Sequence, residues 1–315
     1  MAMGKGLMQK EGTYASEPQP LSTSTTAGPG GGASTRPLTG QQRQMMELAW
    51  QRERAREIAV VGPTSDYLIQ RYRVNRFWRL FTWEFMFKRL DDVAGKTILD
   101  FGCGEGEVSV LLATFGAQVT GVDISPELIG VAEQRAAFDG VADRTRFIVA
   151  DVTESGLPEN TFDVLFCNCV LHHVVDLSQV LPRLVATLKP GGMAIIAEPI
   201  AFSPLLQRFR DMVPIPKDAS PIEHQLNKDE VRLIAAAFDR TRMTFFNFLG
   251  RLTRLFPNRN KIEHGHPFTK AGIVLLLSVD RLILTLFPFL WRLCGNVVFV
   301  GEKPTTSHQR RGSAA

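Results

Sequence analysis

The stretch LDFGCGEGEVSVLL, residues 99–112, places three glycines within five positions, at Gly102, Gly104 and Gly106. An apolar run, TILDF (97–101), precedes the glycines, and an apolar pattern with helical spacing follows them. Glycines this close together favour a tight backbone turn that leaves room for a bulky ligand. The stretch therefore predicts a strand, a ligand-binding turn and a helix.

Strand and helix patterns alternate on the C-terminal side of this turn. Strands are expected at 117–123, 145–151, 162–168 and 192–199, and helices at 106–115, 126–138 and 177–188, the last ending at the breaker KPGG. Short, continuously apolar strands separated by helices are typical of a parallel sheet covered on both faces. This region predicts an α/β fold with a doubly wound sheet.

Further elements flank the alternating region. They are helices at 41–59, 66–90 and 227–238, strands at 241–248 and 295–303, and a helical stretch at 271–292. The sheet is then expected to be mostly parallel with seven strands. We expect 1–40 and 304–315 to be disordered tails, 41–92 to be helices that cover the active site, and 93–303 to be the ligand-binding domain, with a lid at 199–226 and an insertion at 249–292.

Composition narrows the class of protein. Hydrophobic residues make up 44% and charged residues 22%, which is ordinary for a soluble protein. The four cysteines lack CxxC spacing, so we expect structural thiols and no metal site. Charges and Pro288 divide the apolar region 271–293 into runs shorter than the roughly 20 residues of a spanning helix. A cytoplasmic location is expected.

The glycine spacing discriminates between ligands. A nicotinamide enzyme would use G-x-G-x-x-G, whereas this turn reads G-x-G-x-G and comes directly after Asp100 and Phe101. A carboxylate beside the turn would repel a pyrophosphate but attract a ligand ammonium group. No GKS or GKT comes after the turn, which disfavours a phosphate loop. A nicotinamide oxidoreductase and a non-catalytic cofactor-binding module remain the alternatives.

Four motifs succeed one another in the chain: DFGCGEG (100–106), VTGVDIS (119–125), 149–174 and LKPGGMAIIAEP (188–199). In order and spacing they resemble the motifs of class I S-adenosylmethionine-dependent methyltransferases, and most of all the small-molecule branch with the ubiquinone and menaquinone methylases. The resemblance covers about 70–200 and continues more weakly to about 303. It implies a Rossmann-like fold, S-adenosylmethionine as the cofactor and methyl transfer as the activity.

The resemblance also implies roles for individual residues. Asp123, 23 residues after Asp100, would accept hydrogen bonds from both ribose hydroxyls at the end of the second strand. Ile124 would lie against the adenine ring, Asp151 would hold its amino group, and the Val152 backbone its ring nitrogen. Asn168 would lie near the methionine part. The remaining cofactor-binding candidates are in the glycine turn: Asp100, Phe101, Gly102, Cys103 and Gly104. For each carboxylate the structural alternative is a helix N-cap or a turn residue.

Methyl transfer requires an acceptor atom held roughly 3 Å from the methyl carbon. A base is needed only if the acceptor begins protonated. The candidates are His172, His173 and Glu198, with His224 as a further one. We expect one of the adjacent histidines to face the site and the other to pack away. The alternatives are that both histidines are structural and that Glu198 caps the next turn.

The residues at the end of the fourth strand narrow the class of acceptor. Methylases of nucleobase amines carry an N/D-P-P-Y/F motif there, whereas this chain reads NCVLHH (168–173). The region 96–198 is acidic, and no dense basic run occurs, so no nucleic-acid partner is expected. The aromatic segments 66–90, 199–226 and 249–292 are expected to form the acceptor pocket, which favours a small lipophilic or aromatic acceptor. Such segments can equally be core.

Basic residues occur among leucines and phenylalanines in 249–292 and again in 71–89. A surface of this kind can lie on an anionic bilayer with its apolar side down. The alternative is a helix packed on the sheet with a solvated charged face. Peripheral membrane contact is therefore an alternative to a purely cytoplasmic location. The sequence assigns neither the acceptor atom nor the oligomeric state.

Overall fold

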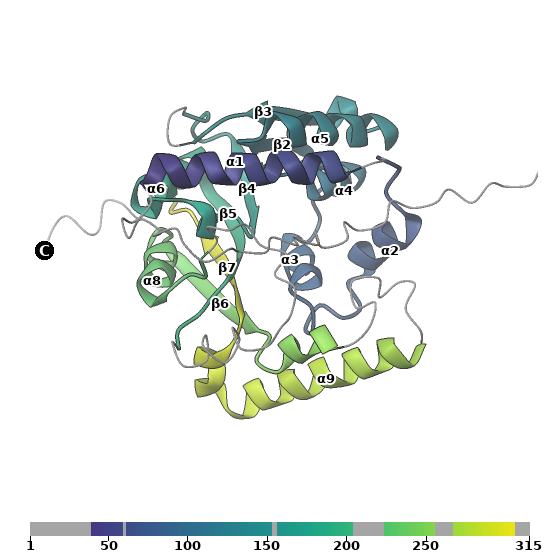
Figure 1. The fold of residues 1–315 in the computed structure, drawn as a ribbon, viewed down its shortest axis with the longest axis vertical. Coiled ribbons are helices and arrows are strands. Elements are labelled where there is room, and N and C mark those ends of the chain that lie inside the picture. Colours follow the sequence, from purple (N-terminus) through teal and green to yellow (C-terminus); the bar gives the residue numbers. More distant parts are fainter. Residues whose placement is uncertain (1–38, 59–60, 153–155, 204–223, 256–266, 306–315) are drawn as a thin grey trace, which may run out of the picture.

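The computed structural model describes residues 39–58, 61–152, 156–203, 224–255 and 267–305, and they form a single sheet with helices on both faces (Figure 1). Its strands are β1 Thr97–Phe101, β2 Gln118–Asp123, β3 Thr145–Val149, β4 Phe162–Asn168, β5 Leu188–Pro199, β6 Arg240–Phe246 and β7 Asn296–Glu302. The strand order is β3-β2-β1-β4-β5-β7-β6. Only β7 runs antiparallel to its neighbours, which confirms the predicted seven-stranded, mostly parallel sheet.

The winding of the sheet reverses at β1, which pairs with β2 on one side and with β4 on the other. Phe101, the last residue of β1, is in register with Val122 and with Cys167. The loops at the ends of these strands therefore leave the sheet at one edge and diverge. In an open α/β sheet this reversal is where ligands bind.

Local signals account for the helices that cover the sheet. These are α4 Glu107–Thr114, α5 Pro126–Phe138, α6 Leu177–Thr187 and α8 Lys228–Ala236. In α5 the Ser125 hydroxyl accepts the Leu128 N–H, and Pro126 occupies the first turn, where a missing N–H costs nothing. In α8 a capping box joins Asn227 and Glu230, as predicted.

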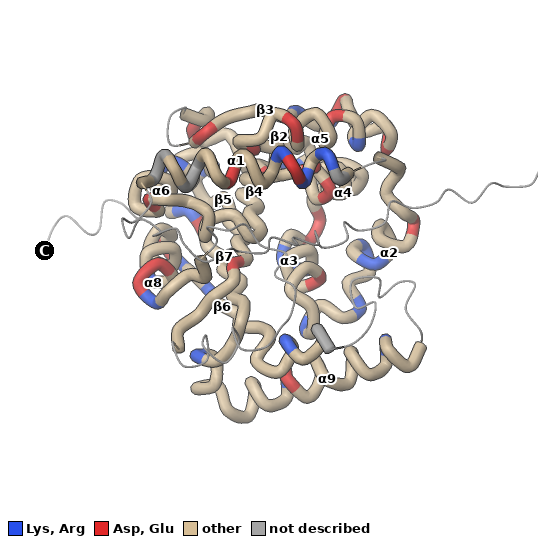
Figure 2. The backbone as a smooth tube through the Cα atoms, in the orientation of Figure 1, with Lys and Arg blue, Asp and Glu red and all other residues tan. Residues whose placement is uncertain are grey.

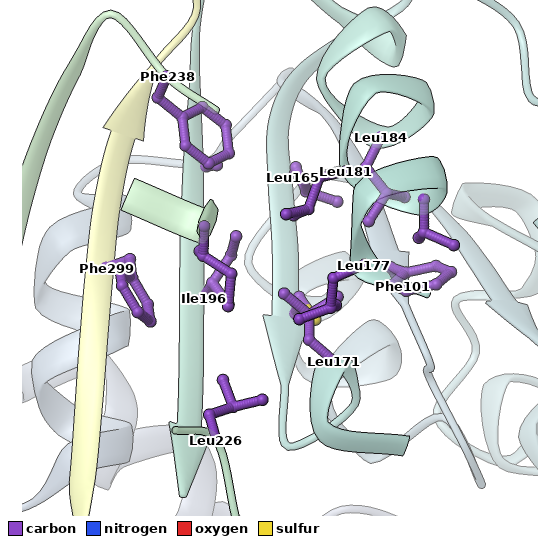
Figure 3. Close-up of a cluster of buried hydrophobic side chains, with 14 of the residues drawn as sticks. Phe101, Leu165, Leu171, Leu177, Leu181, Leu184, Ile196, Leu226, Phe238 and Phe299 are labelled. Carbon is purple, nitrogen blue, oxygen red and sulfur yellow. The ribbon is translucent and has the colours of Figure 1, made fainter. Parts of the chain in front are cut away.

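Alternate residues of each strand enter opposite cores, because successive side chains in a strand point to opposite faces. Leu165 and Ile196 lie on the face covered by α6, with Leu177, Leu181 and Leu184 of that helix (Figure 3). Their neighbours Phe166 and Ile195 lie on the other face. Two fully buried cores therefore hold the strands and fix the position of the loops at their ends.

The segment 66–90 differs from the single helix that was predicted. It forms α2 Asp66–Val74 and α3 Thr82–Leu90, separated at Asn75, whose φ of 50° is left-handed and whose N–H donates to the Arg71 carbonyl. Asparagine tolerates this conformation and ends helices for that reason. The aromatic residues Tyr72, Phe85 and Phe87 of α2 and α3 are buried in the core beside the sheet, whereas Tyr67 is exposed.

The remaining elements differ from their predictions in small ways. β5 begins at Leu188, so KPGG lies inside the strand, which kinks at Gly191 with a φ of 76°. The expected helix at 271–292 is α9 Pro267–Leu286 with the 3₁₀-helix η5 Pro288–Leu293 after it. α1 spans Gly40–Glu57, close to its prediction. Most of the lid (204–223) and of both tails lies outside the described residues. No helix among the described residues is long and apolar enough to cross a membrane.

Candidate active site

A cavity of about 740 Å³ lies at the carboxyl ends of β1, β2 and β4. This volume is within the range of about 300–1,000 Å³ that is usual for small-molecule sites. Its lining comes from the loops after β1 to β5, from α1, from η3 (Gly250–Leu255) and from the start of β7. The candidate cofactor residues that line it are Phe101, Gly102, Gly104, Asp123, Ile124, Asp151, Val152 and Asn168.

The three glycines of the turn after β1 serve different purposes. A Cβ atom on Gly102 would collide with the Val170 side chain, and one on Gly106 would lie 2.6 Å from the Cβ of Ala132. Gly104 also has a left-handed φ, of 51°, but a Cβ there would meet no atom within 4 Å. Gly104 therefore borders open space in the cavity, where a ligand can approach the backbone closely.

Asp123, the last residue of β2, holds this turn in place. Its Oδ2 accepts the Gly104 N–H at 2.9 Å, and its Oδ1 accepts the Ser125 N–H at 2.9 Å. Its burial, at 7% exposed, raises the pKa of this carboxyl above its ordinary value. Each carboxylate oxygen has a second acceptor position, so Asp123 can also accept hydrogen bonds from a ligand in the cavity.

Asp100 and Cys103 lie behind the turn and are not among the cavity's lining residues in the described part of the chain. Asp100 is buried and accepts the Ser109 hydroxyl proton at 2.6 Å. The Cys103 Sγ would lie 2.9 Å from a Cβ on Gly121, so this thiol packs against β2. Both residues support the loop from beneath. Direct contact with a ligand stays a prediction for them.

Burial, together with the nearby Asp123 charge, raises the pKa of Asp100 to about 7. The ordinary pKa in an unfolded chain is about 4. Between these values the folded chain binds a proton that the unfolded chain has released, so stability falls as the pH rises through this window.

We expect Asp100→Asn to remove this fall in stability with rising pH. The free energy of unfolding of the variant, minus that of the natural chain, should therefore rise by roughly 2–4 kcal/mol between about pH 4 and pH 8. Urea unfolding of both chains, measured without ligand at several pH values, checks the expectation. A difference in the free energy of unfolding that stays the same at every pH would contradict a raised pKa at Asp100.

Asp151 and Val152 come after β3, and Asn168 ends β4. β3 stops at Val149, two residues earlier than predicted, so Asp151 lies in the loop that lines the cavity. The Val152 carbonyl accepts the Arg183 guanidinium at 2.9 Å. This bond fixes the loop and uses the carbonyl, not the N–H, of Val152. That Asp151 and Val152 bind adenine, and that Asn168 lies near the methionine part, stay predictions with which these positions are compatible.

The helix α1, which lies in the segment expected to cover the active site, supplies four lining residues that the sequence did not single out: Glu47, Trp50, Gln51 and Arg54. An Arg52–Glu127 ion pair of 2.6 Å joins α1 to α5 at the surface. Glu47 is buried, and its carboxylate adds to those of Asp123 and Asp151 around the cavity. This end of the cavity is acidic and suits a cationic ligand. In sequence, α1 is a charged helix with no motif, so only tertiary packing places it here.

His172 is held by Glu198 of β5. The Nδ1 of His172 lies 2.7 Å from the Oε2 of Glu198, and both side chains are buried. The Oε1 of Glu198 accepts the Val170 and Leu171 N–H groups at 3.0 and 2.7 Å. Glu198 thus fixes the 3₁₀-helix η2 Leu171–His173, and it is not among the described lining residues. A carboxylate at Nδ1 keeps the proton on that nitrogen and makes Nε2 the acceptor.

Both adjacent histidines line the cavity, which corrects the expectation that one would pack away. Their ring centroids are 4.1 Å apart. The Nδ1 of His173 lies 3.3 Å from the Oε2 of Glu47 and so connects η2 to α1. Residues in a 3₁₀-turn are separated by a third of a turn, not by the half turn of a strand, so neighbours can share one side. His224 lies elsewhere, 2.9 Å from Glu230 of α8.

The far end of the cavity has a different lining. Asn247, Gly250, Arg251 and Asn296 contribute to it, and the Nδ2 of Asn247 donates to the Oδ1 of Asn296 at 2.9 Å. No lining residue comes from 66–90 in the described structure, where Tyr72, Phe85 and Phe87 are core and Tyr67 and Phe77 are exposed outside the cavity. Of the expected pocket segments, 199–226 contributes Pro199 and Gln225, and 249–292 contributes residues of η3.

No cluster of potential metal ligands occurs among the described residues.

Comparison with known proteins agrees with this geometry. Residues 99–196 match the family model described as a methyltransferase domain. The chain is 41% identical over 113 residues to the mitochondrial ubiquinone biosynthesis O-methyltransferase of Schizosaccharomyces pombe, a match that covers 36% of this chain and 41% of that protein. Residues 99–196 of the chain are therefore similar to a methyltransferase domain, and the chain spans about two fifths of the length of this relative.

Two solved structures have a similar fold. The cyclase SpnF aligns with 85% of this chain and 97% of its own at a TM-score of 0.53 and 17% identity. A phosphoethanolamine N-methyltransferase 2 of Haemonchus contortus, in complex with S-adenosyl-L-methionine, aligns with 85% of this chain and 58% of its own at a TM-score of 0.52 and 18% identity. At these identities the likeness shows the fold, which alone does not determine the reaction.

Proposed function

We propose that this chain transfers a methyl group from S-adenosylmethionine to a small lipophilic or aromatic acceptor. The observation that carries the proposal is the joint position of Gly104 and Asp123. Gly104 opens onto the cavity, and Asp123 ends the neighbouring strand with Oδ2 bonded to the Gly104 N–H and Oδ1 bonded to the Ser125 N–H after β2. This pairing fits a ligand that brings hydroxyl groups and a positive charge to the glycine turn.

The residues present fit the cofactor at its three recognisable parts. Asp123 would accept its ribose hydroxyls, and Asp151 its adenine amino group. The acidic lining with Glu47 favours its ammonium and sulfonium charges, while it disfavours the pyrophosphate of a nicotinamide cofactor. When bound, the cofactor supplies an electrophilic methyl group.

The chain's own contribution to the chemistry is positioning and proton handling. His172 is the residue best placed for the second task, because Glu198 orients its ring and the ring lines the cavity. With Nδ1 donating to Glu198, Nε2 would accept a proton from a hydroxyl acceptor. Glu198 would act as a positioning residue for His172, since it lies behind the cavity wall.

The lipophilic acceptor is favoured by two observations. The curated relative from S. pombe is named for ubiquinone biosynthesis, although this chain covers less than half of its length. The N/D-P-P-Y/F motif of nucleobase methylases is also missing after β4, where the chain forms η2.

The expected result is tight binding of S-adenosylmethionine without binding of a nicotinamide dinucleotide, measured by calorimetry. Incubation of the purified chain and a cell extract with methyl-labelled cofactor should place the label in small molecules that partition into organic solvent. Mass spectrometry identifies these products and the methylated atom. Label recovered mainly in nucleic acid or protein would contradict the acceptor class, and lack of cofactor binding would contradict the proposal as a whole.

A further inference from the structure

The surface of α9 and η5 carries a row of exposed apolar side chains, here named the α9 face. Its members are Phe268, Leu275, Val279, Leu282, Leu286, Phe287 and Phe289. Phe268 is 81% exposed and Leu275 is 65% exposed. We infer that the α9 face docks on the surface of a lipid bilayer with anionic headgroups.

The spacing of these residues places them on one side of the helix. Leu275, Val279, Leu282 and Leu286 succeed one another at intervals of four, three and four residues, which is the repeat of a single helical face. The opposite side holds the buried residues Ile273, Leu277 and Asp280. The helix is thus anchored by one side and presents a second, apolar one to the outside. Monomeric soluble proteins seldom expose contiguous apolar surfaces of this kind.

The charges around the α9 face favour an anionic partner. Exposed basic residues lie in and beside it, at Arg76, Arg79 and Arg292, with the half-buried Lys270, whereas Asp280 is the one acidic residue of α9. Asp280 is buried, and its Oδ1 accepts the Leu249 N–H at 2.6 Å. Figure 2 shows α9 as a largely uncharged helix at one end of the molecule, whereas charged residues gather in the second half of α1.

This combination is that of a helix lying in a membrane interface. An apolar side over a helix of 20 residues enters the boundary between headgroups and acyl chains, and basic residues at its margins bind anionic lipid. The exposed Phe77, between Arg76 and Arg79, adds a second apolar and basic site beside α9. The Arg79 charge lies close enough to Arg281 of α9 to lower the pKa of that guanidinium further than burial alone does.

The α9 face adjoins the far end of the cavity through η3. A Cβ atom on Gly250 would lie 3.0 Å from the Cδ2 of Leu277, on the inner side of α9. Gly250, Arg251 and Thr253 line the cavity, while Leu252 between them is 47% exposed. A lipophilic acceptor could therefore pass from the bilayer along η3 into the cavity. This last step rests on the proposed function, whereas the docking itself does not.

Vesicle flotation with the full chain, in the absence of cofactor and acceptor, tests the docking. Vesicles of phosphatidylcholine mixed with phosphatidylglycerol should carry the chain upward at low salt, and high salt should reduce the bound fraction. Phe268→Ser combined with Leu275→Ser should lower the partition coefficient by roughly tenfold or more, because both side chains would lie in the interface. Arg76→Gln with Arg79→Gln should weaken binding to the vesicles that contain phosphatidylglycerol. It should leave binding to vesicles of phosphatidylcholine alone unchanged.

The matched control is Phe138→Ser with Leu233→Ser. These residues are an exposed phenylalanine and an exposed leucine on α5 and α8, away from α9 (Figure 1). The control should bind vesicles like the natural chain, and thermal melting monitored by circular dichroism should show that every variant is folded.

Three outcomes would overturn the inference. The first is a natural chain that stays with the soluble fraction at low salt. The second is an equal loss of binding in the α9 variant and in its control. The third is a chain that forms a dimer through these residues without binding vesicles, which would assign the α9 face to a second copy. Calorimetric binding of S-adenosylmethionine, measured without vesicles, shows separately whether the proposed function holds.

Discussion

A chain with His172 replaced by alanine should lose about 100-fold or more in turnover, while its affinity for S-adenosylmethionine changes little. General acid–base catalysis by one side chain contributes typically 10²–10⁴-fold, and His172 is the cavity histidine whose ring is held by the buried Glu198. Because the Nδ1 bond to Glu198 leaves Nε2 as the acceptor, the loss should appear in the chemical step. Steady-state kinetics with the acceptor found by methyl labelling, together with calorimetry of the cofactor, measures both quantities.

Two further variants separate a base from a structural residue. Glu198→Gln keeps the shape of the side chain but removes the charge beside Nδ1, so it should also lower turnover and move the pH dependence of the rate. His224→Ala removes a histidine outside the cavity lining and should leave turnover unchanged. If His172→Ala weakens cofactor binding as much as turnover, His172 belongs to the cofactor pocket, not to proton transfer.

The second large effect is expected from Asp123→Ala, which should weaken S-adenosylmethionine binding at least tenfold. Two hydrogen bonds to the ribose would be lost at about 1 kcal/mol each, and a factor of ten corresponds to about 1.4 kcal/mol. The variant also releases the Gly104 N–H, so the glycine turn would lose its support. Isothermal titration of both chains with the cofactor measures the difference.

Glu127→Ala provides the comparison for Asp123. Glu127 lies close to Asp123 in sequence but on the surface, where it pairs with Arg52, and it is not among the described lining residues. Its removal should leave cofactor affinity intact. Unchanged affinity in the Asp123 variant, with melting curves that show a folded chain, would remove the ribose assignment.

Elements with strong local signals could be predicted closely from the sequence. α5 was predicted with its observed bounds because Ser125 and Pro126 mark its first turn and its apolar residues face the sheet. The β4 strand was predicted equally well because its residues are buried on both faces. The seven strands and their mainly parallel arrangement were predicted from the same pattern of short apolar runs.

The predictions that differ from the structure concern segments in which tertiary contacts override the local sequence pattern. The break between α2 and α3 depends on one left-handed asparagine, Asn75, inside an otherwise continuous aromatic pattern. The KPGG segment, predicted as a breaker, stays in β5 because Gly191 supplies a left-handed kink within the strand. Glu47 and Trp50 reach the cavity only because α1 packs beside α5, and nothing in their sequence marks them as lining residues.

The polarity of α1 has a consequence for how the cavity opens. Glu47 is the one buried residue among the α1 side chains that the structure describes, and the surface ion pair of Arg52 with Glu127 adds little free energy. With one buried residue and few polar contacts, α1 is expected to form a separate unit of local unfolding that can detach while both cores of the sheet stay intact. Any ligand that touches α1 must restrain this detachment. The observed cofactor affinity is then the intrinsic affinity multiplied by the fraction of molecules in which α1 is in place.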